Sequence, residues 1–253
     1  MLLHPLLDKL RALRCPGMAD ALEEQLQQHQ LNLSFEERLS LLVEREYWLR
    51  DNRRLTQRLR NAAFKQASAC MEDIDYRASR GLSRSVINTL STCQWVRDKH
   101  NVLLIGPTGT GKSYLACALS HKACLMGFAA RYVRLPRLLQ EMQVARGDGS
   151  YTKLIQQLAK INVLILDDWG LAPLNDLQRR DLLEILDDRY QRSSTIVTSQ
   201  LPLKHWHEAI GDPTLADAIL DRLVHNAHKI ELKGPSLRKK NNTETNPVEN
   251  ESN

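Results

Sequence analysis

The chain has 253 residues, of which 42% are hydrophobic and only 5% aromatic, and its formal net charge at pH 7 is +5. This length suffices for one domain of average size with a mainly aliphatic core and for a smaller accessory domain. Because the sequence shows neither a signal peptide nor a long apolar run, we expect neither a secreted nor a membrane-spanning protein. The basic balance favours an anionic partner, and five cysteines without C-x-x-C spacing predict reduced thiols in the cytoplasm.

Residues 1–65 predict a small helical domain, because apolar residues recur at intervals of three and four and glycine and proline are rare. A break at Cys15-Pro16-Gly17 separates a first helix from a second one over Met18–Gln30. A third helix is predicted from Phe35 to about Phe64, with Ser34 as its N-cap and acidic residues in its first turn.

The last half of this third helix carries a basic face. Its basic residues fall in an arc of about 160° when successive residues are placed 100° apart, and apolar residues occupy the opposite side. A solvated helix face normally mixes charges of both signs, so this face predicts DNA binding. An acidic protein partner and an ordinary solvated surface are the alternatives. The predicted DNA-binding residues are Arg50, Arg53, Arg54, Arg58, Arg60 and Lys65.

A phosphate-binding loop follows an apolar strand at VLLIGPTGTGKS (102–113). The pattern G-x-x-x-x-G-K-[ST] lets backbone N–H groups and a helix N-terminus face phosphate oxygens. Lys112 is expected to reach the β- and γ-phosphates, and Ser113 to coordinate Mg²⁺. The predicted nucleotide-binding residues are Gly106, Pro107, Thr108, Gly109, Thr110, Gly111, Lys112 and Ser113.

A second buried strand, INVLILDD (161–168), ends in two carboxylates. Open α/β sheets place ligands at the carboxyl ends of their strands, so we expect Asp167 to hold Mg²⁺ and Asp168 to activate the attacking water. The alternative is a pair of aspartates that only shape a turn. Further strands are predicted at Ala130–Arg134, at 194–198, ending at Ser199-Gln200, and at Lys229–Leu232. From about Gly234 the chain is polar and without periodicity, which predicts disorder.

The alternation of strands and helices around these motifs resembles the AAA+ ATPase core. More narrowly, residues from about 35 to 232 resemble the IstB family, the ATP-binding helper proteins of bacterial insertion sequences, which are related to the DnaC helicase loaders and DnaA initiators. The matching segments are DYRASRGL (75–82), LLIGPTGTGKS (103–113), LILDDWGL (164–171), TIVTSQLP (195–202) and LDRLVHNAHKIEL (220–232).

The resemblance implies an α/β fold: a P-loop AAA+ core with a five-stranded parallel sheet flanked by helices, preceded by a small all-α N-terminal domain and without a C-terminal lid domain. We therefore predict a helical domain for DNA binding and assembly over 1–65, an ATPase domain over 66–234 and a disordered tail over 235–253.

The resemblance also implies site roles that spacing alone does not show. Gln200, with Ser199 beside it, matches the sensor-1 position, and Arg222 matches the arginine finger that reaches a neighbouring subunit's ATP site. Tyr76 would lie near the adenine. A helix arginine paired with Asp217 or Asp221 is the alternative for Arg222. The expected catalytic residues are Lys112, Asp168, Gln200 and Arg222.

These expectations define an ATPase that uses ATP and Mg²⁺, oligomerises on double-stranded DNA and assists a transposase. Hydrolysis to ADP and phosphate is expected to be slow and stimulated by assembly or by DNA. A helicase loader with the same ATPase is the close alternative. A small-molecule kinase, and a scaffold that binds ATP without hydrolysing it, are the more distant ones; the scaffold stays open because Asp168 stands where many AAA+ proteins have Glu.

Overall fold

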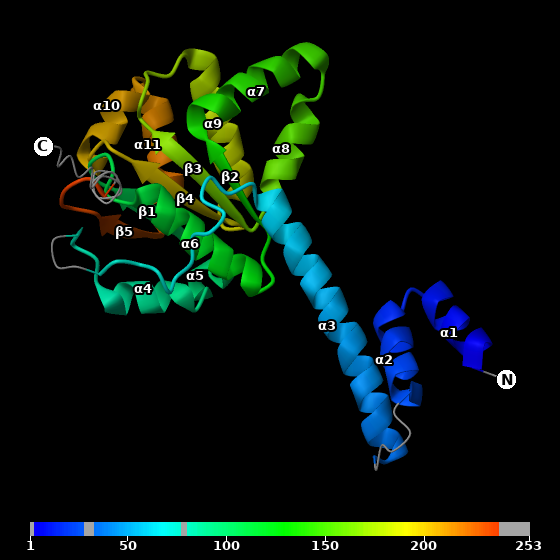
Figure 1. The fold of residues 1–253 in the computed structure, drawn as a ribbon. Coiled ribbons are helices and arrows are strands. Elements are labelled where there is room, and N and C mark those ends of the chain that lie inside the picture. Colours follow the sequence, from blue (N-terminus) through cyan, green and yellow to red (C-terminus); the bar gives the residue numbers. More distant parts are fainter. Residues whose placement is uncertain (1–2, 28–32, 77–79, 238–253) are drawn as a thin grey trace, which may run out of the picture. The chain divides into compact units, whose positions relative to one another are not determined.

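The computed structural model describes residues 3–27, 33–76 and 80–237 (Figure 1). The chain divides into two compact units between Gln57 and Arg58. This division falls inside helix α3 (Phe35–Ala62), eight residues before the boundary predicted from the sequence. Each unit is described by itself.

The first unit is helical, as predicted. It contains α1 (Leu3–Ala12), α2 (Pro16–Gln27) and most of α3. The buried carboxylate of Glu46 on α3 accepts hydrogen bonds from the backbone N–H groups of Gly17 at 2.7 Å and Met18 at 3.3 Å. A negative charge at the start of α2 is favourable, because the first N–H groups of a helix lack partners within it. A Cβ atom at Gly17 would lie 2.9 Å from the Glu46 Cα, so only glycine permits this approach of α2 to α3.

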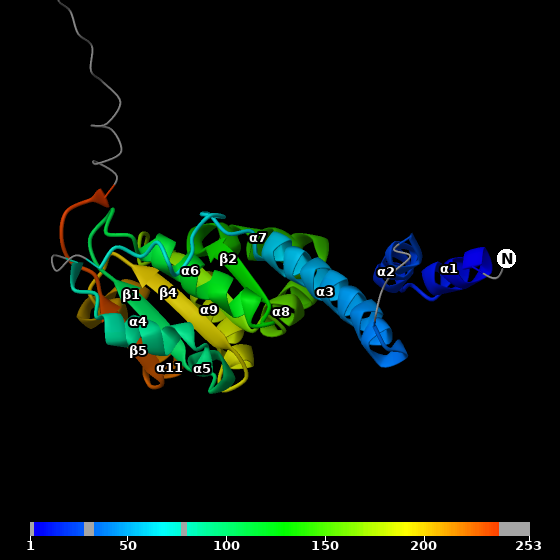
Figure 2. The same cartoon turned by 60° about the horizontal axis from the view of Figure 1, so that its bottom comes forward.

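The second unit is built on a sheet of five parallel strands in the order β2-β3-β4-β1-β5, which confirms the predicted fold (Figures 1 and 2). The strands at its centre are buried along almost their whole length, as a parallel sheet covered on both faces requires. The strands are β1 (Asn101–Ile105), β2 (Ala130–Arg134), β3 (Val163–Trp169), β4 (Ser194–Ser199) and β5 (Ala227–Glu231).

Helices form a layer on each face of this sheet. Helix α6 packs against β1 to β4 on one face with α4 beside it, and the larger apolar core joins α7 to α11 to the other face (Figure 1). Leu103, Leu166 and Val197 point into this larger core. The helices of the second unit are α4 (Arg84–Ser91), α5 (Gln94–Arg97), α6 (Lys112–Leu125), α7 (Leu135–Asp148), α8 (Tyr151–Ala159), α9 (Asp176–Arg189), the 3₁₀ helix η2 (Leu203–His205), α10 (Trp206–Ile210) and α11 (Pro213–Val224).

None of the helices in the described ranges is both long enough and apolar enough to span a bilayer.

Candidate nucleotide-binding site

The strand register brings three loops together at the carboxyl edge of the sheet. Ile105 at the end of β1 lies beside Ser199 at the end of β4, and Ser199 lies beside Trp169 of β3. Between this pair and the pair Leu166–Val197, β3 has one residue more than β4, which is a β-bulge. Asp168 occupies the bulge with a φ of 67°. Aspartate tolerates this left-handed conformation better than most residues, and the bulge turns the two neighbouring carboxylates in different directions.

The loop after β1 folds back over the start of α6, and its glycines are required for this path. Gly109 and Gly111 have φ values of 82° and 91°. A Cβ atom at Gly109 would lie 2.0 Å from Ser236 Oγ, and one at Gly111 would lie 2.5 Å from Arg80 Nη2. Side chains at these positions would therefore fill the cradle in which a phosphate group fits.

Lys112, the first residue of α6, is buried at the bottom of this loop. Its Nζ donates to the carbonyl oxygens of Gly106 at 2.7 Å and Pro107 at 2.8 Å. The loop thus holds a positive charge beside the N-terminus of a fourteen-residue helix. A triphosphate is the ligand that this combination of ammonium group, backbone N–H groups and helix dipole fits best.

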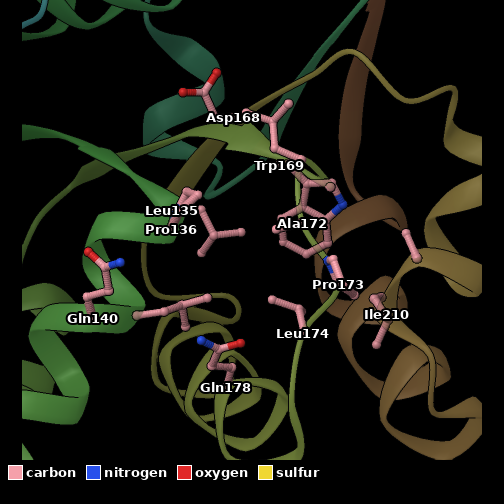
Figure 3. Close-up of a pocket in the computed structure, with 14 residues that line it drawn as sticks. Leu135, Pro136, Gln140, Asp168, Trp169, Ala172, Pro173, Leu174, Gln178 and Ile210 are labelled. Atoms are coloured by element: carbon pink, nitrogen blue, oxygen red, sulfur yellow. The ribbon is translucent and has the colours of Figure 1, made fainter.

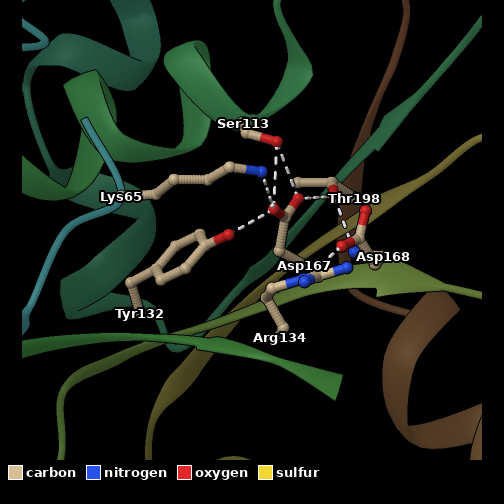
Figure 4. A network of polar contacts seen from close by, with 7 residues as sticks. All are labelled: Lys65, Ser113, Tyr132, Arg134, Asp167, Asp168 and Thr198. Carbon is tan, nitrogen blue, oxygen red and sulfur yellow. Dashed lines mark hydrogen bonds and ion pairs between the residues drawn. The ribbon is translucent and has the colours of Figure 1, made fainter. Parts of the chain in front are cut away.

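The Asp167 carboxylate is the centre of a buried polar network (Figure 4). It accepts hydrogen bonds from the hydroxyl groups of Ser113 at 2.8 Å, Tyr132 and Thr198, and Lys65 Nζ lies 3.5 Å away. Burial alone would raise the pKa of Asp167, but the hydrogen bonds from Thr198, Tyr132 and Ser113 and the charge of Lys65 lower it below its ordinary value. An ionised carboxylate beside a serine hydroxyl is an oxygen ligand set that suits Mg²⁺.

Asp168 points away from this network toward β2. Its carboxylate accepts a hydrogen bond from Arg134 Nε at 2.7 Å, and its backbone N–H donates to Thr198 Oγ1 at 3.3 Å (Figure 4). The hydrogen bond to Asp168 raises the pKa of Arg134, so the guanidinium keeps its positive charge. The proposed catalytic base is therefore held by a cation of its own chain.

Ser199 and Gln200, the two polar residues at the end of β4, make different contacts. Gln200 Oε1 accepts a hydrogen bond from Thr108 Oγ1 of the P-loop at 2.5 Å. The Ser199 hydroxyl instead donates to the Trp169 carbonyl at 2.9 Å and accepts from the Leu201 N–H at 3.0 Å. Gln200, rather than Ser199, is therefore the side chain at this strand end that contacts the P-loop.

These elements enclose a pocket of about 330 Å³. The connector before β1 contributes to its wall: the buried guanidinium of Arg80 donates to the Thr110 carbonyl at 2.8 Å and to the Asp75 carbonyl at 2.6 Å. At the other end of the unit, the Leu237 N–H donates to the Gly109 carbonyl at 2.9 Å. The first residues of the predicted tail therefore lie against the P-loop, while 238–253 fall outside the described residues.

Two of the residues assigned by resemblance lie away from this pocket. The ring of Tyr76 does not line it, and the Arg84 guanidinium lies 5.0 Å from the ring centre. Arg222 lies near the end of α11, where its carbonyl accepts from Asn101 Nδ2 at 2.9 Å at the amino edge of the sheet. Its guanidinium pairs with Asp187 of α9, and not with Asp217 or Asp221 as the alternative interpretation expected. Any role of Arg222 in hydrolysis must therefore be exerted on another copy of the chain.

Lys65 does not belong to the basic face of α3, contrary to the prediction from the sequence. Helix α3 ends at Ala62, and Ala63 has a φ of 49°, so the spacing of 100° per residue stops before Lys65. Its ammonium group enters the nucleotide pocket instead.

The other five residues of the face fall in both units. In the first unit Arg53 and Arg54 are exposed, whereas Arg50 is held by Glu46 and by the carbonyl of Arg14. In the second unit Arg60 is exposed. Arg58 is half-buried, with Gly127 at the end of α6 nearby.

A second cavity, of about 190 Å³, lies beside the loop that follows β3 (Figure 3). Leu135 of α7, Leu174 and Ile210 contribute apolar walls, and Trp169 packs on Trp206 with ring centres 4.9 Å apart. Asp168 lines this cavity as well as the P-loop pocket, but the described lining residues include no cation. The cavity therefore suits an apolar group and not a phosphate.

The fold and the site together define the class of protein. A P-loop after β1, an aspartate-tipped β3 and the strand order β2-β3-β4-β1-β5 are those of the AAA+ fold. Residues 8–245 match the family described as IstB-like ATP binding protein, and the chain belongs to this family.

Similar proteins agree with this assignment. A Sinorhizobium fredii protein that carries the name of an insertion sequence ATP-binding protein is 52% identical over 240 residues, which cover 94% of this chain and 98% of that protein. The crystal structure of DnaI has a TM-score of 0.57 at 21% identity and covers 66% of this chain and 92% of its own. The replication initiator DnaA bound to AMPPCP and single-stranded DNA has a TM-score of 0.56 at 15% identity and covers 74% of this chain and 58% of its own.

Proposed function

We propose that this protein is an ATPase that assembles on duplex DNA in its ATP state and assists the transposase of an insertion sequence. The observation that carries the proposal is the convergence of Ser113, Asp167, Asp168 and Gln200 on one pocket beside the P-loop. The transposition context rests on the names of the relatives, which are insertion sequence ATP-binding proteins.

In this proposal the loop N–H groups and Lys112 bind the β- and γ-phosphates. Ser113 and Asp167 would hold Mg²⁺, which supplies charge neutralisation between the phosphates when bound. Asp168 accepts a proton from a water molecule, whose oxygen forms a bond to the γ-phosphorus as the bond from that phosphorus to the ADP oxygen breaks. Gln200 orients the water or the phosphate, and Arg222 of a neighbouring copy would stabilise the charge on the transferred group.

The DNA-binding half of the proposal rests on charge. The chain carries a net charge of +5, and the exposed Arg53 and Arg54 in the first unit and Arg60 in the second are available to phosphate oxygens. Contacts of this kind give weak sequence preference and steep salt dependence. The structural relative DnaA, which was solved with both AMPPCP and single-stranded DNA, supports a link between nucleotide and DNA.

The decisive experiment is electron microscopy and sedimentation of the protein with duplex DNA in the presence of ATP or ADP. We expect regular assemblies on DNA with ATP, few with ADP, and none with Lys112→Ala. Assemblies that form equally well with both nucleotides would overturn the proposed ATP control. A strong preference for single strands would favour the helicase-loader alternative.

A further inference from the structure

Lys65 reaches the nucleotide pocket from a segment that leaves α3 abruptly. Its Nζ lies 3.5 Å from Asp167 Oδ2, and its side chain lines the same pocket as Lys112 and Ser113 (Figure 4). The left-handed Ala63 directs the chain toward this pocket, as described above. Lys65 therefore stands on the side of the site where the terminal phosphates would lie, because Ser113 and Asp167 would hold the Mg²⁺ that neutralises them.

The backbone around Lys65 is fixed to the helix that begins in the P-loop. Ala69 is buried against Cys117 and Ala118 of α6, and Phe64 packs against the same cluster. The Cys70 N–H also donates to the Tyr114 hydroxyl at 3.4 Å. The position of the Lys65 backbone is therefore set by α6 itself, so the lysine belongs to the built site and not to a loose surface loop.

The charges of the pocket give Lys65 a different role from the other cations in its wall. Lys112 is held by two loop carbonyls, and Arg80 is held by Thr110 and Asp75. The contact of Lys65 is an ion pair with Asp167, a carboxylate that we assign to Mg²⁺. A divalent cation at Asp167 would compete with the lysine for the same oxygens, which leaves the ammonium group to pair with another anion of the site.

We propose that Lys65 is a ligand of the nucleotide's terminal phosphate and that it makes the affinity of the pocket depend on the presence of this phosphate. The proposal rests on the nucleotide site proposed above and adds to it a residue outside the P-loop and strand-tip motifs. It also removes Lys65 from the DNA-binding surface. The last turn of α3 is then joined directly to the residue that distinguishes ATP from ADP.

The test compares the binding of ATPγS and ADP, both with Mg²⁺, to the full chain by titration calorimetry. Lys65→Ala should weaken ATPγS binding about 10- to 100-fold, the range for a hydrogen bond to a charged group, and ADP binding less than about twofold. Lys65→Arg should keep most of the preference for ATPγS. Lys122→Ala, a lysine of α6 that does not line the pocket, is the matched control and should resemble the wild type.

Two results would overturn the proposal. Equal weakening of both nucleotides would mean that Lys65 only supports Asp167, and tighter binding by Lys65→Ala would mean that the lysine merely competes with Mg²⁺. Retained ADP affinity shows that the variant is folded. If the nucleotide site itself were wrongly assigned, a different result would be seen, because Lys112→Ala would then bind both nucleotides normally.

Discussion

The Arg134 guanidinium donates a hydrogen bond to the Asp168 carboxylate at 2.7 Å, across the ends of the neighbouring strands β2 and β3. The register that pairs Arg134 with Asp167, together with the bulge at Asp168, brings the two side chains together. A carboxylate engaged by a guanidinium has to give up this hydrogen bond before it can turn to a water molecule and accept a proton from it. The pair therefore restrains the residue that we propose as the catalytic base.

Removing this restraint should raise ATP turnover. The Arg134 side chain is 55% exposed, so the pair is worth at most about 1 kcal/mol, and we expect Arg134→Gln to increase steady-state phosphate release about twofold to fivefold at saturating ATP. Arg137→Gln changes an exposed arginine on α7 nearby and should leave turnover unchanged. A fall in turnover with unaltered ATP affinity would show that Arg134 assists the reaction instead.

The centre of the fold is predictable from sequence because its determinants are local. Four consecutive apolar residues stand before Gly106 and before Asp167, and such runs require strands covered on both faces. The residues of the P-loop are identified directly by its sequence pattern. Tyr132 and Arg134 are also predictable as neighbours of the site, although they are not among its predicted residues. They stand at the end of a predicted strand, and the carboxyl ends of parallel strands share one edge of the sheet.

Other parts of the site depend on tertiary contacts that cannot be predicted from the spacing of residues in the sequence. Helical periodicity assigned Lys65 to the basic face, because a single left-handed residue, Ala63, is not visible in the sequence. The partner of Arg222 is Asp187, 35 positions away on α9, so acidic residues near it in sequence were the wrong candidates. Thr198 lies inside a buried strand, and its sequence position alone does not show that its hydroxyl donates to Asp167.

Tyr132 should control the affinity of the site for Mg²⁺. Its hydroxyl donates to the buried Asp167 carboxylate, and this bond helps to hold the pKa of Asp167 low. Tyr132→Phe removes the donor, and a hydrogen bond to a charged group is worth about 1.5–3 kcal/mol. We expect the Mg²⁺ concentration that half-saturates nucleotide binding to rise about tenfold. Tyr190→Phe, at the end of α9 and away from the pocket, is the control, and an unchanged Mg²⁺ dependence in Tyr132→Phe would remove Asp167 from the metal site.

A role of Arg222 in hydrolysis can be distinguished experimentally from a structural role of its ion pair with Asp187. Arg222→Ala should bind ATP normally but lose most of its turnover, about 100-fold or more, if the guanidinium completes the site of a neighbouring copy. Asp187→Asn breaks the same intramolecular pair while it keeps the arginine. Turnover that falls equally in both variants would mean that the pair is structural. Loss confined to Arg222→Ala, and rescued by mixing with Lys112→Ala protein, would indicate a finger acting between subunits.

Arg53 and Arg54, exposed on α3 in the first unit, should set much of the salt dependence of DNA binding. Each phosphate contact adds about 0.9 to the slope of log affinity against log salt concentration. Arg53→Gln combined with Arg54→Gln should therefore reduce the slope by about two for each bound protein, with ATP affinity unchanged. The measurement is fluorescence anisotropy of labelled duplex DNA at a series of salt concentrations.

The matched control for this prediction is Arg11→Gln. Arg11 is also an exposed arginine of the first unit, but its guanidinium is already paired with Glu23 at 3.1 Å and lies 3.8 Å from Asp20. Because these carboxylates neutralise it, its loss should leave the slope unaltered. An unchanged slope in the Arg53 and Arg54 double variant would show that this part of α3 is an ordinary solvated surface. An equal reduction in both variants would show that net charge, and not the position of the arginines on α3, determines DNA affinity.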